Sequence, residues 1–237
     1  MHKDGWREAM CGSITLYDPE GERLHTIYCA ATPEYGKERF REKFSREIER
    51  VKERFPEALY AGVADGARDN WVFLEPYTPR RIVDFDQARE YLSKAATAIF
   101  GRDHKSRDAW VTDWSHRLKH TQGTAGRLLK ELGVRRATLD SKNFIERDEA
   151  LRQVIVDYRN NKSRMGYPNH LKRKLPLGSG VTEAACKTVV KQRLCVSGSR
   201  WKDGGARCVL ALRTLTLTSG RWQQFWRYVM RHGCTLY

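Results

Sequence analysis

Two acidic residues have a sequence context in which carboxylates could bind a metal ion, and Asp65 is the first of them. It follows the short apolar segment 59–64, which has the composition of a buried strand, so its carboxylate would lie where that strand meets solvent. A sheet fixes the direction of such a carboxylate, and hard cations prefer oxygen ligands. Asp65-Gly66 is also a common turn pair, in which the aspartate bonds to its own backbone. The spacing alone leaves both interpretations open.

Glu183 is the second, because it is the only acidic residue between Tyr158 and Lys202, a stretch rich in lysine and arginine. A basic surface that binds phosphate gains nothing from a central acid, unless that acid holds a metal ion. Two simpler roles for Glu183 stay open. It lies in the first turn of an expected helix, where the helix dipole favours an acid, and it could pair with Lys187 four residues later.

Carboxylates that converge across a sheet and a helix can hold two Mg²⁺ ions about 3.5–4 Å apart. One ion activates the attacking oxygen and the other stabilises the leaving oxygen of a phosphodiester. The chemistry expected from Asp65 and Glu183 is therefore cleavage of a nucleic-acid backbone with Mg²⁺ or Mn²⁺, in which a basic surface holds the DNA.

The net charge of +15 over 237 residues indicates a polyanionic partner. Residues 1–100 carry a net charge of −2, whereas residues 101–237 carry +17. Lysine and arginine surfaces bind phosphate backbones, and such binding weakens with salt because counterions are released. The candidate DNA-binding residues are basic side chains and one tryptophan of the C-terminal part: Lys172, Arg173, Lys174, Lys187, Lys191, Arg193, Arg200, Trp201 and Lys202.

The elements that would position these residues follow from the hydrophobic pattern, which predicts a sheet in the first hundred residues. Residues 6–17 and 24–31 read as a β-hairpin around an Asp-Pro-Glu-Gly turn. Apolar residues spaced three and four apart predict an amphipathic helix over 40–55. Two short strands are expected over 59–64 and 81–85, and Asp86 is the expected N-cap of the helix that follows.

The rest of the chain is expected to be helical. Residues 109–165 have a basic, helical pattern, and Ser179 is the expected N-cap of a helix over 181–196. Two further helices are expected over 205–217 and 222–231. The order of elements indicates an α/β or α+β fold.

Two side-chain groups have simpler interpretations. The stripe Trp222, Phe225 and Trp226 is interpreted as core or an oligomer contact rather than a base-stacking surface. The six cysteines include no C-x-x-C pair, so we expect buried cytosolic thiols and no zinc site.

Several segments of the chain carry a family resemblance. Residues 178–187 (GSGVTEAACK), followed by 192–194 (QRL) and 200–201 (RW), resemble the C-terminal catalytic signature of bacterial insertion-sequence transposases. The most similar are those of the Kra-type family, relatives of the Mutator-like DDE enzymes. Other segments agree in the same order, so that the resemblance spans essentially the whole chain: 5–9 (GWREA), 64–71 (ADGARDNW), 83–85 (VDF) and 158–168 (YRNNKSRMGYP).

This resemblance implies an RNase H-like catalytic core with a helical insertion between the last sheet strand and the acidic helix. Asp65 would match the second catalytic aspartate of the family and Glu183 its catalytic glutamate. Asp84 would match the acid of a D-x-x-H element, as a supporting acid, although Gln87 replaces the histidine here. The first catalytic aspartate of the family lies on a strand upstream of residues 5–9, so we expect this central first strand to be missing.

We therefore expect a sheet half over 1–100, a helical insertion over 101–177, and C-terminal helices over 178–237 that carry the acidic residue and the basic surface. The expected protein is an N-terminally truncated DDE transposase, cytoplasmic and nucleoid-associated. It would act on DNA with Mg²⁺ or Mn²⁺, oligomerise when intact, and have no membrane partner. Truncation predicts that non-specific DNA affinity is retained while transposition is impaired or absent.

Two alternatives remain. The first is a catalytically inactive DNA-binding remnant of a transposase, which would bind DNA with the same dependence on salt. The second, weaker alternative is a basic RNA-binding protein without nuclease ancestry.

Overall fold

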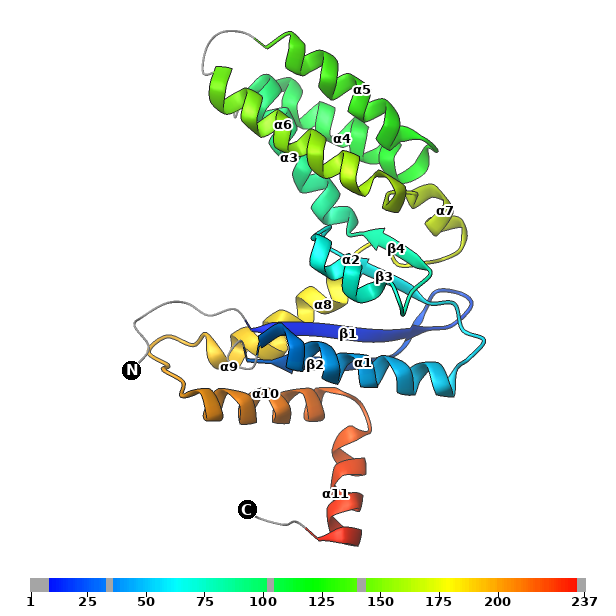
Figure 1. Cartoon of the computed structure of the whole chain (residues 1–237), viewed down its shortest axis with the longest axis vertical. Coiled ribbons are helices and arrows are strands. Elements are labelled where there is room, and N and C mark those ends of the chain that lie inside the picture. Colours follow the sequence, from blue (N-terminus) through cyan, green and yellow to red (C-terminus); the bar gives the residue numbers. More distant parts are fainter. Residues whose placement is uncertain (1–8, 33–35, 102–104, 140–143, 234–237) are drawn as a thin grey trace. The chain divides into compact units, whose positions relative to one another are not determined.

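The computed structural model describes residues 9–32, 36–101, 105–139 and 144–233, and in this part of the chain the protein is mixed α/β with mostly helices (Figure 1). The chain divides into two compact units. Unit 1 combines residues 1–58 with 180–237, and unit 2 is the continuous segment 59–179. The expected fold class, α and β elements with a helical C-terminus, is confirmed at this level.

This division differs from the three parts expected from the sequence. The expected boundary at 177/178 lies next to the observed one at 179/180, but the expected boundary at 100/101 falls inside unit 2. The structure instead separates the expected sheet half after residue 58. The reason is packing: the hairpin shares its core with the C-terminal helices, whereas the two short strands share theirs with the central helices.

Unit 1 is built on the predicted hairpin. Strands β1 (Met10–Tyr17) and β2 (Arg23–Ala31) pair antiparallel. The turn between them is closed by the Gly21 amide, which donates to the Asp18 carbonyl at 3.1 Å, and by the Glu22 amide, which donates to Asp18 Oδ1 at 2.8 Å. The predicted hairpin and turn are confirmed over these residues, and positions 6–8 of the expected first segment lie outside the described part of the chain.

Successive residues of β1 face opposite sides of the hairpin. On one side, the Phe40 and Phe44 rings of α1 (Gly36–Arg54) lie against Gly12, where a Cβ atom would come within 3.1–3.2 Å of them. On the other side, buried residues of β2 and the C-terminal helices form a small cluster: Ala30, Ala185, Val189 and Leu210. The hairpin is therefore covered on both faces.

The helix expected over 181–196 is present, but it is not uniform. It consists of α8 (Gly180–Ala185), the π-helical segment η3 (Cys186–Lys191) and α9 (Gln192–Leu194). The residues at both junctions keep right-handed helical angles, so the helix is continuous. Segments of π-helix are frequent at functional sites.

The last two helices of unit 1 also lie where they were expected. α10 (Asp203–Leu217) buries Ala206, Leu210 and Thr214. By contrast, α11 (Arg221–His232) has no buried residue, and its Trp222, Phe225 and Trp226 are 38%, 39% and 45% exposed. Of the two interpretations of this stripe, core is wrong, because its rings pack on one another rather than under another element, and an oligomer contact stays a prediction.

Unit 2 combines a short parallel strand pair with a group of helices. β3 (Ala61–Ala64) and β4 (Arg80–Val83) lie where the sequence predicts strands, and α2 (Arg68–Leu74) connects them. The helices follow in the order α3 (Phe85–Phe100), α4 (Lys105–His120), α5 (Thr124–Ala137), α6 (Phe144–Asn161), the 3₁₀ turn η2 (Lys162–Arg164) and α7 (Tyr167–Lys172). Figure 1 shows α3 to α6 side by side. Their buried side chains, among them Leu92, Leu118 and Leu128, form one core with Ile82 and Val83 of β4.

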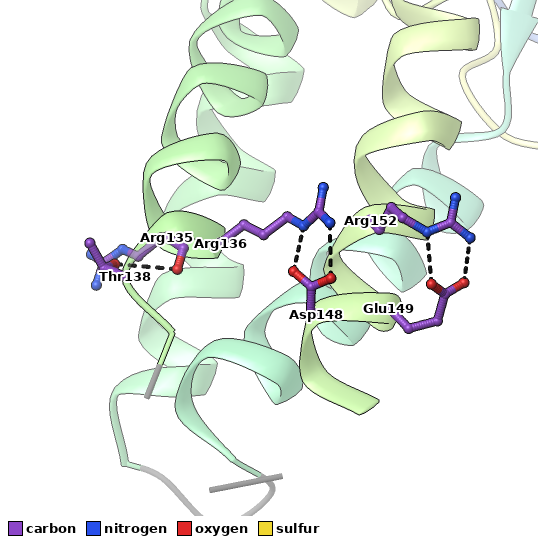
Figure 2. Close-up of polar contacts among 6 residues, drawn as sticks. All are labelled: Arg135, Arg136, Thr138, Asp148, Glu149 and Arg152. Carbon is purple, nitrogen blue, oxygen red and sulfur yellow. Dashed lines mark hydrogen bonds and ion pairs between the residues drawn. The ribbon is translucent and has the colours of Figure 1, made fainter. Parts of the chain in front are cut away.

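Part of the positive charge of unit 2 holds these helices together. Arg136 of α5 makes a bidentate pair with Asp148 of α6, with Nε–Oδ1 and Nη2–Oδ2 distances of 2.6 and 2.9 Å (Figure 2). This hydrogen bonding holds the pKa of Asp148 below its usual value. The Arg147 guanidinium donates to the carbonyls of Ala98 and Ile99 in the last turn of α3, where unpaired carbonyls need donors. These arginines have a structural role.

No helix in the described part of the chain is both long enough and apolar enough to cross a bilayer.

Candidate carboxylate site

The two aspartates of unit 2 follow neighbouring parallel strands. Ala64, the last residue of β3, lies opposite Val83, the last residue of β4. Asp65 and Asp84 therefore directly follow the carboxyl ends of the two strands. The Asp84 amide donates to the Ala64 carbonyl at 2.8 Å, which continues the ladder by one more bond. Ligand sites of open α/β sheets lie at this edge. The predicted position of Asp65 at a strand end is confirmed.

The exposed carboxylate of Asp65 takes part in a turn. Its Oδ1 accepts hydrogen bonds from the Ala67 amide at 3.1 Å and from Asn70 Nδ2 at 2.9 Å. Gly66 has φ of +85°, a conformation that favours glycine. The turn expected as the simpler interpretation is therefore present. Both of these bonds use Oδ1, and among the described residues Oδ2 has no hydrogen-bond donor, so it remains open to a cation.

A buried polar cluster holds this turn in place. Trp71 Nε1 donates to Asn161 Oδ1 at 2.9 Å and to the Gly66 carbonyl at 3.1 Å. The Arg164 guanidinium lies 4.8 Å from the centroid of the Trp71 ring and donates to Asn161 Oδ1 at 3.3 Å. Burial lowers the pKa of Arg164. The cluster rigidifies the backbone that carries Asp65.

Single positions in the sequence do not reveal this cluster. Trp71 and Asn161 belong to the segments 64–71 and 158–168, whose only signal in the sequence is a collinear resemblance to a family. In the structure these two segments pack against each other. Tyr158 and Tyr167, from the second segment, are fully buried, and their hydroxyls donate to the Ala88 and Val83 carbonyls at 2.8 and 3.0 Å. The two segments therefore support the edge of the β3–β4 pair that carries Asp65 and Asp84.

Asp84 has a different environment, because it is only 3% exposed and both of its oxygens are fully used. Oδ1 accepts from the amides of Asp86 at 2.7 Å and Gln87 at 3.3 Å, so Asp84 is the N-cap of α3. The expectation that Asp86 caps this helix is wrong by two positions. Oδ2 accepts from the amide of Ser179 at 2.5 Å and from its hydroxyl. Asp84 is thus a structural residue that joins β4, α3 and the segment before α8.

Glu183 belongs to unit 1, where it is exposed in the first turn of α8, as the sequence predicts. It lines an open hollow on one helix face together with Cys186, Lys187, Lys191 and Gln192. The structure therefore brings Asp65 and Asp84 to one strand edge, whereas Glu183 belongs to the other unit. Within the described residues, no three side chains of His, Cys, Asp or Glu gather closely enough to hold a metal ion.

The candidate DNA-binding residues are all exposed, and they fall in both units. Lys172, Arg173 and Lys174 stand at the end of α7 in unit 2. The others belong to unit 1, on the helix that carries Glu183 and just before α10: Lys187, Lys191, Arg193, Arg200, Trp201 and Lys202. The Trp201 ring is 42% exposed. All of these side chains are thus accessible to a polyanion.

The thiols of unit 1 differ in exposure and in acidity. Cys29 is buried, as expected, and burial raises its pKa to about 11. Cys195 and Cys208 are exposed, so the expectation of buried thiols is wrong for them, and Cys234 lies outside the described residues. A hydrogen bond with Cys11 lowers the pKa of Cys186 to about 7, although burial opposes this shift, and the same bond raises the pKa of Cys11.

Comparisons of the chain with protein-family models, with curated proteins and with solved structures found no match.

Proposed function

We propose that this chain acts as a DDE-type transposase, an enzyme that cleaves and joins DNA at the ends of insertion sequences with Mg²⁺ or Mn²⁺. The observation that carries the proposal is the position of Asp65. Its carboxylate is exposed at the carboxyl end of a parallel strand, with Oδ2 open and with a buried cluster beneath it. Residues 64–71, which contain Asp65, resemble the second catalytic motif of the transposases, and this resemblance is the reason for proposing metal-dependent cleavage of DNA.

This function requires a particular fold. That fold would be an RNase H-like core, as the resemblance implies. Residues 101–177 would be the helical insertion, and the helix over 180–194 would be the acidic helix of that fold.

Two side chains fit the metal in this proposal. Asp65 and Glu183 are exposed carboxylates, and oxygen ligands of this kind suit Mg²⁺. Asp84 does not fit as a metal ligand, because its two oxygens already accept four hydrogen bonds. Its role is to hold the strand edge in position. The metal would supply activation of the attacking oxygen and stabilisation of the leaving oxygen. The exposed lysines beside Glu183 would bind the phosphate backbone.

A second candidate function is a DNA-binding protein of the same ancestry without catalysis. The observation that favours it is the turn at Asp65, whose Oδ1 already accepts hydrogen bonds from the Ala67 amide and the Asn70 side chain. Both candidates predict DNA binding that weakens with salt, so the distinction rests on catalysis.

A nicking assay on supercoiled plasmid tests the two candidates, because it requires no knowledge of the transposon ends. The full chain is incubated with plasmid and Mn²⁺, and DNA affinity is measured separately in EDTA by fluorescence anisotropy. Under the proposal, Asp65→Asn and Glu183→Gln each lower the nicking rate about a hundredfold or more, since losing even a partner behind a metal ligand costs about 10–100-fold, while DNA affinity stays the same or rises. Asp203→Asn, which changes another acid of the C-terminal segment, is the matched control.

The outcomes separate cleanly. Nicking that survives both substitutions overturns the assignment of these carboxylates. A wild-type chain that binds DNA with steep salt dependence but nicks no plasmid, with either Mn²⁺ or Mg²⁺, supports the non-catalytic candidate. A chain whose affinity for DNA does not change with salt contradicts both.

A further inference from the structure

One face of the helix over 180–194 runs along β1 with a regular register. Ser13 Oγ lies 2.7 Å from Thr182 Oγ1. Cys11 stands two residues before Ser13, which is about 6.6–6.8 Å along a strand, and on the same side of the hairpin. Cys186 stands four residues after Thr182, which is about 6 Å along a helix. Figure 1 shows that β1 and the helix over 180–194 run in opposite directions. The register set by Ser13 and Thr182 therefore also places Cys11 beside Cys186.

The register places the two thiols beside each other, and each alters the pKa of the other. They differ in character. Cys186 is half-buried and lines the open hollow beside Glu183, and the charge of Lys191 lowers its pKa while that of Glu183 raises it. Cys11 faces it from β1 and packs at the edge of the cluster formed by Ala30, Ala185, Val189 and Leu210. A thiolate that is open to small molecules and adjoins a second thiol is the usual arrangement of an oxidation-sensitive pair.

We propose that Cys186 and Cys11 are a peroxide-reactive pair that closes to a disulfide between the helix over 180–194 and β1. The Cys186 thiolate attacks one oxygen of hydrogen peroxide, the O–O bond breaks, and the products are a sulfenic acid and hydroxide, which takes up a proton to become water. Cys11 then attacks the sulfenic sulfur, the S–O bond breaks, and a second water leaves. Overall, two thiols are oxidised and one peroxide is reduced to two waters.

The disulfide would act on the candidate catalytic helix. Cys186 follows Glu183 by one helical turn and is the first residue of the π-helical segment. A covalent link to β1 would hold this turn against the hairpin and would remove the thiolate from the hollow that Glu183 lines. A cellular dithiol would reverse the link by thiol–disulfide exchange. This pair is independent of the proposed function, because it needs neither a metal nor DNA.

Peptide mapping of the full chain tests the proposal. Trypsin places Cys11 in residues 8–23 and Cys186 in residues 175–187, and neither peptide contains another cysteine. The reduced protein is treated with one equivalent of hydrogen peroxide at pH 7, alkylated and digested without reductant. We expect the cross-linked peptide as the main product, its loss on addition of reductant, and consumption of Cys186 at least about threefold faster than Cys195.

Two variants sharpen the result. Cys11→Ser removes the second thiol, so the sulfenic acid on Cys186 should persist long enough to be trapped by dimedone. Cys195→Ser, which removes an exposed thiol elsewhere on the chain, should leave the cross-link unchanged. The proposal is overturned if the wild-type chain links Cys11 to Cys29, if it forms only intermolecular disulfides through the exposed cysteines, or if Cys186 remains reduced while Cys195 is consumed.

Discussion

The buried carboxylate of Asp84 illustrates how a single residue can have a different role from the one its sequence context implies. Its context, a short strand ending in an acid, is the same as that of Asp65. The two differ in burial and in partners, because Asp84 accepts four hydrogen bonds while Asp65 keeps an open oxygen. Resemblance alone treats both as acids of the site, whereas the structure assigns one to the scaffold.

Replacing Asp84 with asparagine should destabilise the protein. The amide keeps only one acceptor oxygen, so donors of Ser179 or of the first turn of α3 lose their partner in a buried place. We expect the free energy of unfolding to fall by about 2–3 kcal/mol, the range for hydrogen bonds to a charged group. Urea denaturation measures this change.

The matched control is Asp86→Asn, two positions away on the exposed side of α3, which should alter the free energy of unfolding by less than about 0.5 kcal/mol. Equal unfolding midpoints for the Asp84 and Asp86 variants would contradict the structural role of Asp84.

Between elements, one ion pair fastens the last helix to the rest of unit 1. Glu47 of α1 is buried, and it accepts hydrogen bonds from both terminal nitrogens of Arg221 at the start of α11, one of them at 2.9 Å. Arg221 thereby holds the pKa of Glu47 below its usual range. No residue of α11 is buried, so the aromatic stripe contributes little to the fold, and this pair ties the first turn of α11 to α1.

The lowered pKa predicts how stability depends on pH. The folded state binds fewer protons than the unfolded state near the pKa of Glu47, so the contribution of the pair is complete above the unfolded pKa of about 4.3. It is lost as pH falls through the lower folded pKa. We expect Glu47→Gln to lower the free energy of unfolding by about 2 kcal/mol at pH 7, within the range for hydrogen bonds to a charged group, and to have progressively less effect below pH of about 4.

Thermal or urea unfolding of wild type and Glu47→Gln across this pH range provides the measurement. Glu49→Gln, on an exposed position of the same helix, is the control and should show no such pH-dependent difference. A Glu47→Gln effect that stays constant from pH 7 to pH 3 would show that the pair is not the cause.

For the whole molecule, folding redistributes the charge that is so uneven along the chain. The near-neutral segment 1–58 folds together with the basic segment 180–237, so that unit 1 carries a net charge of +7 and unit 2 carries +8. The basic character is therefore shared between the units. Some of it is also internal to unit 2, where Arg136 and Arg147 bind neighbouring helices.

The division into units predicts that residues 59–179 fold on their own. Their hydrophobic core contains only residues of this segment, from Ala61 to Leu177, and the segment is continuous. We expect the isolated segment to show a helical circular dichroism spectrum and a cooperative urea transition with an m-value of about 1–3 kcal/mol/M. Residues 180–237 alone should not fold, because Ala185, Val189 and Leu210 need Ala30 of the hairpin to complete their cluster. A non-cooperative transition of 59–179 would contradict the division.

The sequence by itself determined the positions of the four strands, of α1, α3 and the helices after residue 180, the first-turn position of Glu183 and the strand-end position of Asp65. These features follow from local periodicity and turn residues, which act over a few positions. It also predicted the exposed basic side chains, because charged side chains are costly to bury.

Only the tertiary structure decided which of these elements share a core, and which of the two strand-end acids is buried and which is exposed. Ser179 lies 95 residues from Asp84, and Asn161 lies 90 residues from Trp71, so neither partnership leaves a signal in local pattern. The hairpin likewise meets helices from the other end of the chain, and this contact brings Cys11 to Cys186. Such pairings depend on how apolar faces and buried polar groups fit in space, which residue type and spacing do not specify.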